Sequence, residues 1–525
     1  MEDIKQLIVK KNTTLGIELG STRIKAVLID KCGNVLASGA FDWENSLVNG
    51  VWTYPLSEAV KGVQSAFAKL KADVYKKYGV KLTSAGAMGI SGMMHGYLPF
   101  DKDGVQICEF RTWRNTITAE SAQILSEKFN FNIPQRWSVA HLYQAMLNKE
   151  EHVKNIDFIC TLSVYIHRLL TGEKVIGIGE ASGMFPIDSE TNDYSEKMLG
   201  IFDSSLSVLD RPLRSILPKV LCAGDSAGTL TEEGALLLDP TGEFESGIPM
   251  CPPEGDAGTG MVATDSVAKR TGNISAGTSI FLMAVLEKPL SKLYPEIDIV
   301  TTPDGSPVAM VHCNNCCGEI DAWANLFASL CEKMGLDVSV YKVLDKIFEC
   351  ALSGDKDCGG LVGYNYISGE VITGLDTGKP LFFRQPDSAF TFENFARMLL
   401  CSAVATLSIG MDILKGENVK IDSLTGHGGY FKAPTAGQKI MSAALEAPVS
   451  VMKTAGEGGP WGMAILAGYM LNKKGGESLG DYLKENIFSD NSAFEVMSDE
   501  NDRAGFKAFL DSYRKGLAAE KAAVG

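Results

Sequence analysis

The sequence predicts an α/β protein of two related lobes, each a mixed sheet covered by helices. Three observations support this. The fold opens with three short apolar strands joined by tight turns, then a long amphipathic helix and a fourth strand. The same strand–turn–strand pattern returns near the middle of the chain, where Gly277 lies 257 residues after Gly20. The length of 525 residues accommodates two such lobes.

The opening pattern predicts strands over Leu15–Leu19, Ile24–Ile29 and Val35–Phe41, with turns at Gly20-Ser21-Thr22 and Asp30–Asn34. These three strands form a meander in which neighbours run antiparallel.

A helix is expected to follow, capped by Ser57 and ending before Gly79, because its apolar residues recur at steps of three and four. Ala85–Ile90 is the fourth strand. A helix between two strands places that helix on a face of the sheet, so the sheet is mixed rather than purely antiparallel.

The second half repeats this order. Gly272–Ala276 and Ile280–Leu286 are predicted strands on either side of a Gly277-Thr278-Ser279 turn. The remaining predictions are strands Val308–Cys313 and Ile421–Thr425, helices Glu319–Met334, Phe392–Leu414 and Pro434–Leu445, and a helical tail from Asp499. We therefore expect a first lobe over residues 12–265, a second over 266–480 and a tail over 481–525.

Composition excludes several classes of protein. Hydrophobic residues make up 45% and charged residues 22%, which is typical of a globular chain and not of a disordered or fibrous one. The 49 basic and 64 acidic residues give a net charge of −15, which argues against binding to duplex nucleic acid.

Cellular location is predicted from what the sequence lacks. The N-terminus has no apolar signal core, and Met398–Met411 is too short and too polar to span a membrane. Twelve cysteines without a signal sequence are expected to stay reduced. We expect a cytoplasmic protein without a membrane partner, in which Met398–Met411 lies in a buried helix.

Glycine is over-represented, with 54 residues or about one in ten, and it gathers in turns. Backbone N–H groups in such turns bind anionic oxygens, and the hydroxyls of Gly20-Ser21-Thr22 and Gly277-Thr278-Ser279 add donors. With Gly428 and Gly429 as a third cluster, the pattern favours a nucleotide over ordinary hairpin turns. The P-loop motif G-x-x-x-x-G-K-[ST] is absent, which excludes a P-loop enzyme.

Two carboxylates lie beside these turns. Asp256, among the small residues of Glu254–Gly258, could accept a proton from a hydroxyl that attacks a γ-phosphate. Glu18 could reach Mg²⁺ through water. The alternatives are an Asp in a simple turn and an edge-strand carboxylate.

A further set of residues suits a polyhydroxylated ligand. Met94 and His95 follow the fourth strand, and Trp113 and Asn115 come shortly after. An aromatic face combined with directional polar groups is what a sugar needs. The alternative is that His95 caps a strand and Trp113 packs in the core.

Two other motifs have less support. Gly224–Gly228 matches the G-x-S-x-G elbow of hydrolases around Ser226, but the residues after it predict a strand end and a new helix cap. Cys313 and Cys316 have the spacing of half a zinc site, yet no second ligand pair follows. We interpret these thiols as packed where a strand ends and a helix starts.

Taken together and in order, the motifs resemble the FGGY carbohydrate kinase family, a relative of actin and hexokinase. The resemblance runs from about Leu15 to about Tyr469. The segments that carry it are Gly16–Thr22, Gly89–Gly96 (similar to the sugar segment of xylulokinases), Ala181–Phe185 with Asp188, Gly255-Asp256-Ala257, Ala276–Ser279, and two adenosine-site segments, Gly426–Lys432 and Gly456–Gly468.

The resemblance implies two actin-like (ribonuclease H-like) lobes with the active site in the cleft between them. It implies Asp256 as the catalytic base and a sugar site formed by Met94, His95, Trp113, Asn115 and Asp256. It implies Mg²⁺ held by Glu18 through water. The nucleotide contacts it implies are Gly20, Ser21, Thr22, Lys25, Gly277, Thr278, Ser279, Gly428, Gly429 and Lys432.

Three segments depart from the family pattern, at four positions. Glu18 replaces the usual Asp, Asn115 and Arg114 replace the Asp and Asn of xylulokinases, and His427 interrupts the adenosine glycines. The expected function is ATP- and Mg²⁺-dependent phosphorylation of a ketopentose (xylulose- or ribulose-like), with a homodimer as a family-based expectation. The alternatives are a kinase for another polyol or deoxysugar, or a family relative that binds nucleotide or sugar without transfer.

Overall fold

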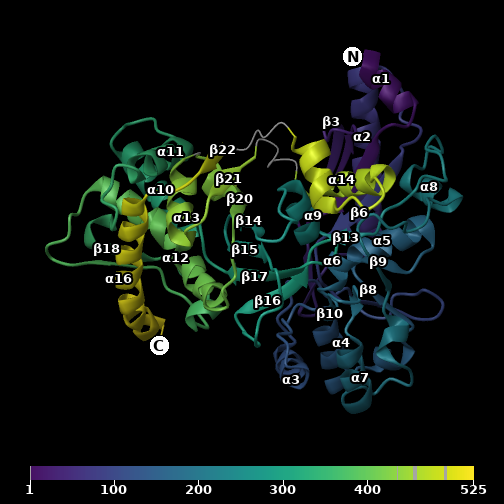
Figure 1. Ribbon diagram of the computed structural model, residues 1–525, viewed down its shortest axis with the longest axis horizontal. Coiled ribbons are helices and arrows are strands. Elements are labelled where there is room, and N and C mark those ends of the chain that lie inside the picture. The colour runs from purple at the N-terminus through teal and green to yellow at the C-terminus, as the bar shows by residue number, and fades with distance from the viewer. Residues whose placement is uncertain (1, 434, 453–457, 490–493, 525) are drawn as a thin grey trace. The chain divides into compact units, whose positions relative to one another are not determined.

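The computed structural model describes residues 2–433, 435–452, 458–489 and 494–524. The chain divides into two compact units, each formed by three separate segments (Figure 1). As far as these residues are described, the first unit comprises Met1–Val267, Asp298–Val308 and Gly456–Asn491. The second comprises Ala268–Ile297, Ala309–Ala455 and Ser492–Gly525.

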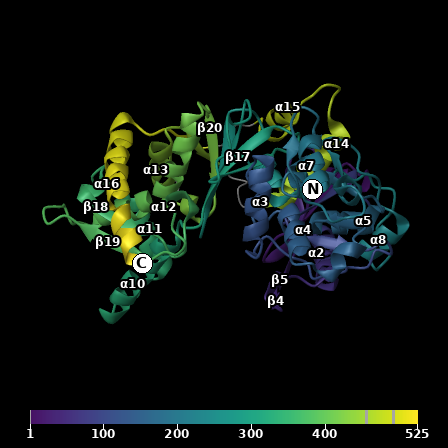
Figure 2. The ribbon, with the colours of Figure 1, turned by 90° about the horizontal axis from the view of Figure 1, so that it is seen from below.

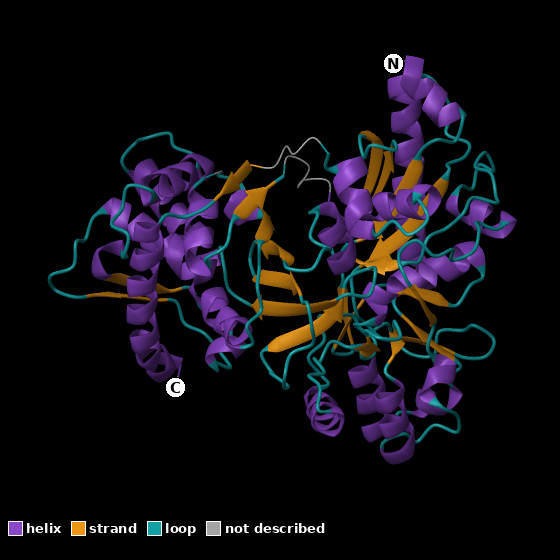
Figure 3. Cartoon of the chain, in the orientation of Figure 1, coloured by secondary structure: helices purple, strands orange, loops and turns teal. Residues whose placement is uncertain are grey.

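A five-stranded mixed sheet forms the centre of the first unit, in the order β13-β6-β1-β2-β3 (Figure 3). Its strands are β1 (Thr14–Leu19), β2 (Arg23–Ile29), β3 (Val35–Asp42), β6 (Ala87–Gly92) and β13 (Glu254–Gly255). Strands β1, β2 and β3 form the predicted antiparallel meander, whereas β6 runs parallel to both β1 and β13. The carboxyl ends of β1, β6 and β13 therefore meet at one edge of the sheet.

Two helices pack on this sheet, and their backbones come close to the backbones of its strands. Helix α2 (Leu56–Tyr78) packs on β3 with four of its five predicted apolar residues buried, Val60 being partly exposed, and it ends at Gly79 with φ of 66°. It begins at Leu56 after Pro55, and the predicted Ser57 cap is wrong. Helix α14 (Gly458–Asn472) packs on β1, where a Cβ at Gly16 would lie 2.0 Å from the Pro460 carbonyl oxygen.

Other elements of the first unit surround this sheet. The helices are α1 (Glu2–Val9), α3 (Ala119–Phe129), α4 (Ser138–Leu147), α5 (Leu162–Thr171), α6 (Ile178–Ala181), α7 (Glu196–Ser205), α8 (Glu232–Leu238), α9 (Asp256–Ala263) and α15 (Leu479–Tyr482), with the shorter turns η1 (Glu151–Asn155), η2 (Leu213–Ile216) and η6 (Leu483–Ile487). The strands are β4 (Ser46–Val48), β5 (Val51–Thr53), β7 (Leu98–Phe100), β8 (Phe158–Cys160), β9 (Val175–Gly177), β10 (Ile187–Asp188), β11 (Asp193–Tyr194) and β12 (Lys219–Leu221).

A seven-stranded sheet in the order β16-β17-β15-β14-β20-β21-β22 repeats the opening pattern in the second half of the chain. Its strands are β14 (Thr271–Ala276), β15 (Ile280–Val285), β16 (Ile297–Thr301), β17 (Pro307–Cys313), β20 (Ser423–His427), β21 (Val449–Val451) and β22 (Phe494–Val496). As β1 does with β2 and β6, β14 pairs antiparallel with β15 and parallel with β20. The predicted internal repeat is thus present in the strand pairing.

Long helices accompany this second sheet. They are α10 (Gly318–Lys333), α11 (Val340–Ala351), α12 (Phe392–Gly416), α13 (Ala436–Leu445) and α16 (Glu500–Val524). The smaller elements are the hairpin of β18 (Leu361–Tyr364) and β19 (Leu381–Arg384) and the turns η3 (Cys358–Gly360), η4 (Val371–Thr373) and η5 (Gly429–Phe431).

Helix α12 is the buried centre of the second unit. Among the described residues it is the one helix whose length and hydropathy suit a membrane span, but 78% of its apolar window is buried inside the protein. The structure thus places Met398–Met411 in a buried helix, as expected. Helix α16 lies alongside α12 and α13 (Figure 2). There Asp502 is fully buried and forms ion pairs with Lys356 at 2.8 Å and Lys439 at 2.9 Å.

The boundaries of the units differ from the expected lobes over residues 12–265, 266–480 and 481–525. Helix α14 was assigned to the second lobe, but it packs on β1 and α9 of the first unit. The tail is also divided, since α15 groups with the first unit and α16 with the second. Local sequence patterns predict where helices begin and end, and they do not show which sheet a helix covers.

Candidate functional site

The Gly20-Ser21-Thr22 turn joins β1 to β2 and is held by aromatic side chains. The Trp43 indole donates to the Gly20 carbonyl at 2.7 Å, and the Tyr54 hydroxyl donates to the Ser21 carbonyl at 2.6 Å. The two rings lie 4.3 Å apart. Because both carbonyls accept hydrogen bonds from these aromatic side chains, the backbone of the turn is restrained on that side.

Asp256, the predicted base, is the first residue of α9 and directly follows β13. Its Oδ1 accepts a hydrogen bond from the Met94 backbone N–H at 3.1 Å. Gly255 lies opposite Gly92 across β13 and β6, and Glu18 lies opposite Ser91 across β1 and β6. The parallel register therefore brings Asp256, the Met94–His95 segment and Glu18 to the same edge of the sheet, although the sequence separates them by up to 238 residues.

Both carboxyls at this edge have raised pKa values. Glu18 is half-buried, and its Oε2 is shielded from water without a hydrogen-bond partner. Burial first, and then the charge of Asp256, raises the pKa of Glu18 to about 8, against an opposing contribution from Lys25. Asp256 is itself solvent-accessible, but the protein atoms crowded around its carboxyl raise its pKa too.

His95 is buried at 6% exposure and is held from both sides. Its Nδ1 lies 3.3 Å from the Gly183 carbonyl oxygen, and its Nε2 accepts from Arg136 Nε at 3.0 Å. Arg136 is in turn ion-paired to Asp298. Burial, followed by the charge of Arg136, holds the pKa of His95 well below its usual value, so the imidazole is neutral.

Two further buried carboxyls lie behind Asp256. Glu254 accepts the backbone N–H groups of Gly179 at 3.1 Å and Glu180 at 2.9 Å, at the start of α6, and burial raises its pKa to about 7. Glu180 is fully buried, and neither of its oxygens has a hydrogen-bond partner among the described residues. Burial raises its pKa well above the ordinary value. Sequence reasoning missed Glu180 and Arg136, which no motif marks, and it gave Glu254 no role, because only the packing reveals these contacts.

The two other predicted sugar residues differ in accessibility. Trp113 is 42% exposed, and its indole donates to Ser21 Oγ at 3.3 Å, which places it beside the first glycine turn. Asn115 is 2% exposed, and its amide bonds to the backbone N–H and C=O of Trp52, each at 2.8 Å. The amide of Asn115 thus holds backbone in place here, and its contact with a sugar stays a prediction.

The second unit brings together two of the predicted nucleotide segments. The Gly277-Thr278-Ser279 turn joins β14 to β15, and Gly428 follows β20 with φ of 100°. A Cβ at Gly428 would lie 2.4 Å from the Ala276 carbonyl oxygen, so only glycine fits this close approach. Gly429 and Lys432 follow in and just after η5, where both are exposed to solvent.

The second adenosine-site segment lies elsewhere. Residues 456 and 457 fall outside the described residues, and Gly458–Gly468 forms the first part of α14 in the first unit. A Cβ at Gly459 would lie 1.4 Å from Glu18 Oε2. This glycine therefore leaves the space that the Glu18 side chain occupies.

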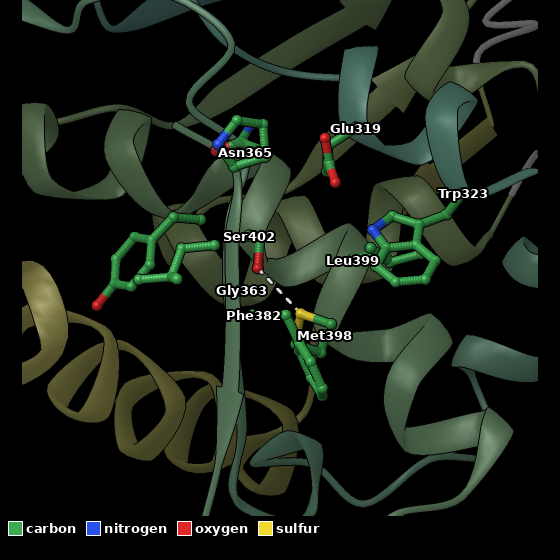
Figure 4. Close-up of a pocket in the computed structure, with 11 residues that line it drawn as sticks. Glu319, Trp323, Gly363, Asn365, Phe382, Met398, Leu399 and Ser402 are labelled. Carbon is green, nitrogen blue, oxygen red and sulfur yellow. Dashed lines mark hydrogen bonds between the residues drawn. The ribbon is translucent and has the colours of Figure 1, made fainter. Parts of the chain in front are cut away.

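A cavity of about 70 Å³ lies in the second unit and contains none of the predicted site residues (Figure 4). It lies among α10, α12 and the β18–β19 hairpin, with Trp323 and Phe382 among its apolar walls and Glu319, Asn365 and Ser402 as its polar ones. In it the Ser402 hydroxyl donates to Met398 Sδ at 3.5 Å.

The structure supports neither the hydrolase motif around Ser226 nor the half zinc site at Cys313 and Cys316. Ser226 lies in a loop, and the next helix starts only at Glu232, capped by the Thr231 hydroxyl. This is not the strand–Ser–helix geometry of a hydrolase elbow. In the described part of the chain, no group of three or more His, Cys, Asp or Glu side chains could hold a metal, so the half zinc site is not completed there.

The residues at the sheet edge nevertheless suit Mg²⁺. Magnesium in kinases is held by one or two carboxylates together with substrate phosphates and water, so no cluster of three protein ligands is needed. Glu18 Oε2 has no hydrogen-bond partner among the residues that the structure describes, and the charge of Asp256 is near enough to contribute to the raised pKa of Glu18. The two carboxylates are therefore placed to share one cation.

Comparison with known proteins agrees with this geometry. Residues 13–257 match the family described as "FGGY family of carbohydrate kinases, N-terminal domain", and residues 272–471 match its C-terminal domain. A xylulose kinase of Haemophilus influenzae is 24% identical over 67% of this chain and 69% of its own.

Solved structures show the same fold. A xylulose kinase from Lactobacillus acidophilus superimposes with a TM-score of 0.78 at 17% identity, covering 98% of this chain and all of that one. A gluconate kinase from the same organism gives 0.79 at 16% identity, covering 98% and 99%. The two family domains together account for most of the sequence, in their expected order and with the expected mixed sheets. The chain belongs to the FGGY family of carbohydrate kinases and is a sugar kinase.

Proposed function

We propose that this enzyme transfers the γ-phosphate of ATP to a hydroxyl of a ketopentose of the xylulose or ribulose type. The observation that carries the proposal is the placement of Asp256, whose Oδ1 is held by the Met94 N–H at the sheet edge that also bears Glu18 and His95. An oriented, accessible carboxylate beside polar and apolar side chains is what a general base for a sugar hydroxyl requires.

In this proposal Asp256 accepts the proton of the attacking hydroxyl. The raised pKa makes its carboxylate a better base than an ordinary Asp, and the Met94 N–H fixes one oxygen so that the other faces the substrate. Neutral His95, kept in place by Arg136 and Gly183, lines the sugar site without adding charge. Trp113 supplies the apolar face for the sugar ring or chain.

The glycine turns are proposed to bind the phosphates of ATP. Gly20, Ser21, Thr22 and Lys25 would act in the first unit, and Gly277, Thr278, Ser279, Gly428, Gly429 and Lys432 in the second. Mg²⁺, held by Glu18 through water, supplies charge neutralisation of the phosphates when bound. We propose a cytoplasmic enzyme whose partners are its small-molecule substrates, and a homodimer as its assembly.

The identity of the sugar rests on the relatives. Four xylulose kinases share 20–24% identity with this chain, and the gluconate kinase has the same fold, so a ketopentose is the first candidate substrate. The backbone bonds of Asn115 favour a sugar site that differs from that of xylulokinases, so the assay should include polyols and deoxyketohexoses.

The test measures ADP release with a panel of ketopentoses, deoxyketohexoses, polyols and gluconate. We expect ATP consumption that depends on one class of sugar, and we expect Asp256→Asn to lower kcat at least about 10²–10⁴-fold while ATP still binds. Asp210→Asn, at an exposed carboxylate of the same unit, is the matched control. Sugar-dependent turnover that survives in Asp256→Asn would refute the role of this residue.

A further inference from the structure

Two adjacent cysteines lie between β17 and α10 and have no part in the proposed reaction. Cys316 and Cys317 follow the end of β17 at Cys313, and their sulfur atoms are 3.6 Å apart. Cys316 is 1% exposed, whereas Cys317 is partly accessible to solvent. The pair is thus a dithiol with one sulfur open to reagents and the other directly behind it.

The spacing of the two sulfurs indicates what could bridge them. At 3.6 Å the two thiols are in hydrogen-bonding contact and are not joined by a disulfide, whose sulfurs lie about 2.05 Å apart. Two sulfurs bonded at about 2.3 Å to one atom lie roughly 3.3 to 3.8 Å apart for bond angles from about 90° to the tetrahedral value, and the observed 3.6 Å falls in that range. The two sulfurs are therefore close enough for a single soft atom to bond to both of them with little movement.

The surroundings narrow the choice of that atom. The described residues contain no group of three or more His, Cys, Asp or Glu side chains able to hold a metal, so the protein does not supply a complete zinc cage here. The bridging atom should therefore need only two protein thiols, with its third bond already made to an organic group of its own. A trivalent organoarsenical provides such an atom.

The dithiol is also tied to the second glycine turn. The Cys317 backbone N–H donates to the Gly277 carbonyl and the Cys316 N–H donates to the Thr278 carbonyl, both at 2.9 Å. These bonds link the turn between β14 and β15 to the start of α10. A group that bridges the two sulfurs would therefore restrain the turn that we propose to bind phosphate.

We propose that Cys316 and Cys317 form a two-thiol binding site for trivalent organoarsenicals, coupled to the Gly277–Ser279 turn. With an arsenous oxide R–As=O, two As–S bonds form, both S–H bonds and the As=O bond break, and the oxygen leaves with the two thiol protons as water. Arsenic remains trivalent, so no oxidant is needed. The contact with Cys317 and burial raise the pKa of the Cys316 thiol, so the first bond forms at Cys317.

The test uses phenylarsine oxide on the full-length protein under native conditions, read by intact mass. We expect one stable adduct per chain, released by an added dithiol but not by a monothiol, and mapped by peptide analysis to residues 316 and 317. Cys317→Ser and Cys316→Ser should each lose the stable adduct, while Cys32→Ser, at an exposed lone thiol, should keep it.

Other outcomes overturn the proposal. Cys358 and Cys401 are a second pair of interacting buried thiols, and an adduct that maps there or persists in Cys317→Ser would refute the site. Absence of any dithiol-reversible adduct on folded wild-type protein would also refute it, whatever the kinase assay shows. The coupling of the dithiol to the Gly277–Ser279 turn rests on the proposed function. If this turn binds phosphate, MgATP should slow the reaction with phenylarsine oxide several-fold. An unchanged rate, in a protein that shows sugar-dependent turnover, would refute the coupling but not the thiol site.

Discussion

Replacing Glu18 by Gln should stabilise the first unit increasingly as the pH rises. In the folded protein the pKa of Glu18 is about 8 instead of 4.5, because its carboxylate loses water and lies near Asp256. A carboxyl with a raised folded pKa binds its proton more tightly in the folded state. The contribution to folding is therefore fully present below pH 4.5 and is lost as the pH rises through 8.

The magnitude follows from this pKa shift. Each pH unit between 4.5 and 8 costs the folded protein about 1.4 kcal/mol relative to a side chain that does not titrate. Between pH 5.5 and 7.5 the upper limit is about 2.7 kcal/mol. Because Glu18 is half-buried, partial exposure to water reduces this, and we expect a change of roughly 2 kcal/mol in the stability difference between Glu18→Gln and wild type.

The assay is urea unfolding at several pH values, followed by tryptophan fluorescence. Five of the six tryptophans lie in the first unit, and Trp323 is the one in the second, so fluorescence reports mainly on the unit that contains Glu18. Glu44→Gln, at an exposed carboxylate, is the control. A stability difference between Glu18→Gln and wild type that does not change with pH would refute the reasoning, as would a destabilised variant at pH 7.5.

Two further predictions concern the second unit. Asp502→Asn should lower the free energy of unfolding of the second unit by about 3 kcal/mol at pH 7, because the buried guanidinium of Arg397, together with Lys356 and Lys439, would lose its anionic partner, as measured by urea unfolding followed by circular dichroism. The wild type should itself lose about 2 kcal/mol as the pH falls from 4 through 2, since these lysines lower the pKa of Asp502 to about 2; a stability without this acid loss would contradict the assignment. Gly428→Ala should weaken ATP binding about tenfold, as measured by calorimetry, because φ of 100° and the nearby Ala276 carbonyl leave no room for a methyl group. An unchanged affinity would show that this turn does not bind the nucleotide.

Local patterns in the sequence predicted the elements that open each half of the fold and the long helices of the second half. The antiparallel meander, the helix ending at Gly79 and the repeated hairpin at Gly277 are all present, since alternation, helical periodicity and glycine act over a few residues. His95 follows the fourth strand, as predicted, whereas Asp256 follows β13, a strand that the sequence analysis did not predict.

What the sequence could not predict depends on contacts between distant segments. Arg136 and Glu180 were missed because their roles arise from packing against His95 and Gly255, and neither sits in a recognisable spacing. The assignment of α14 to the second lobe failed for the same reason, because its burial is set by β1. The backbone bonds of Asn115 were equally invisible, since a buried amide and a ligand-binding amide look alike in a sequence.

The position of α14 on β1 has a consequence for synthesis of the chain. The Trp461 indole donates to the Gly33 carbonyl at 2.7 Å across 428 residues, and a Cβ at Gly16 would collide with α14. A ribosome that has produced the whole first family domain has therefore not yet supplied the helix that covers its sheet. Until residue 458 emerges, the face of β1 that α14 covers has no partner, and an exposed apolar strand of this kind favours aggregation of the nascent chain. Truncation before α14 should for this reason yield an insoluble first unit, although it leaves every residue of the proposed sugar site in place.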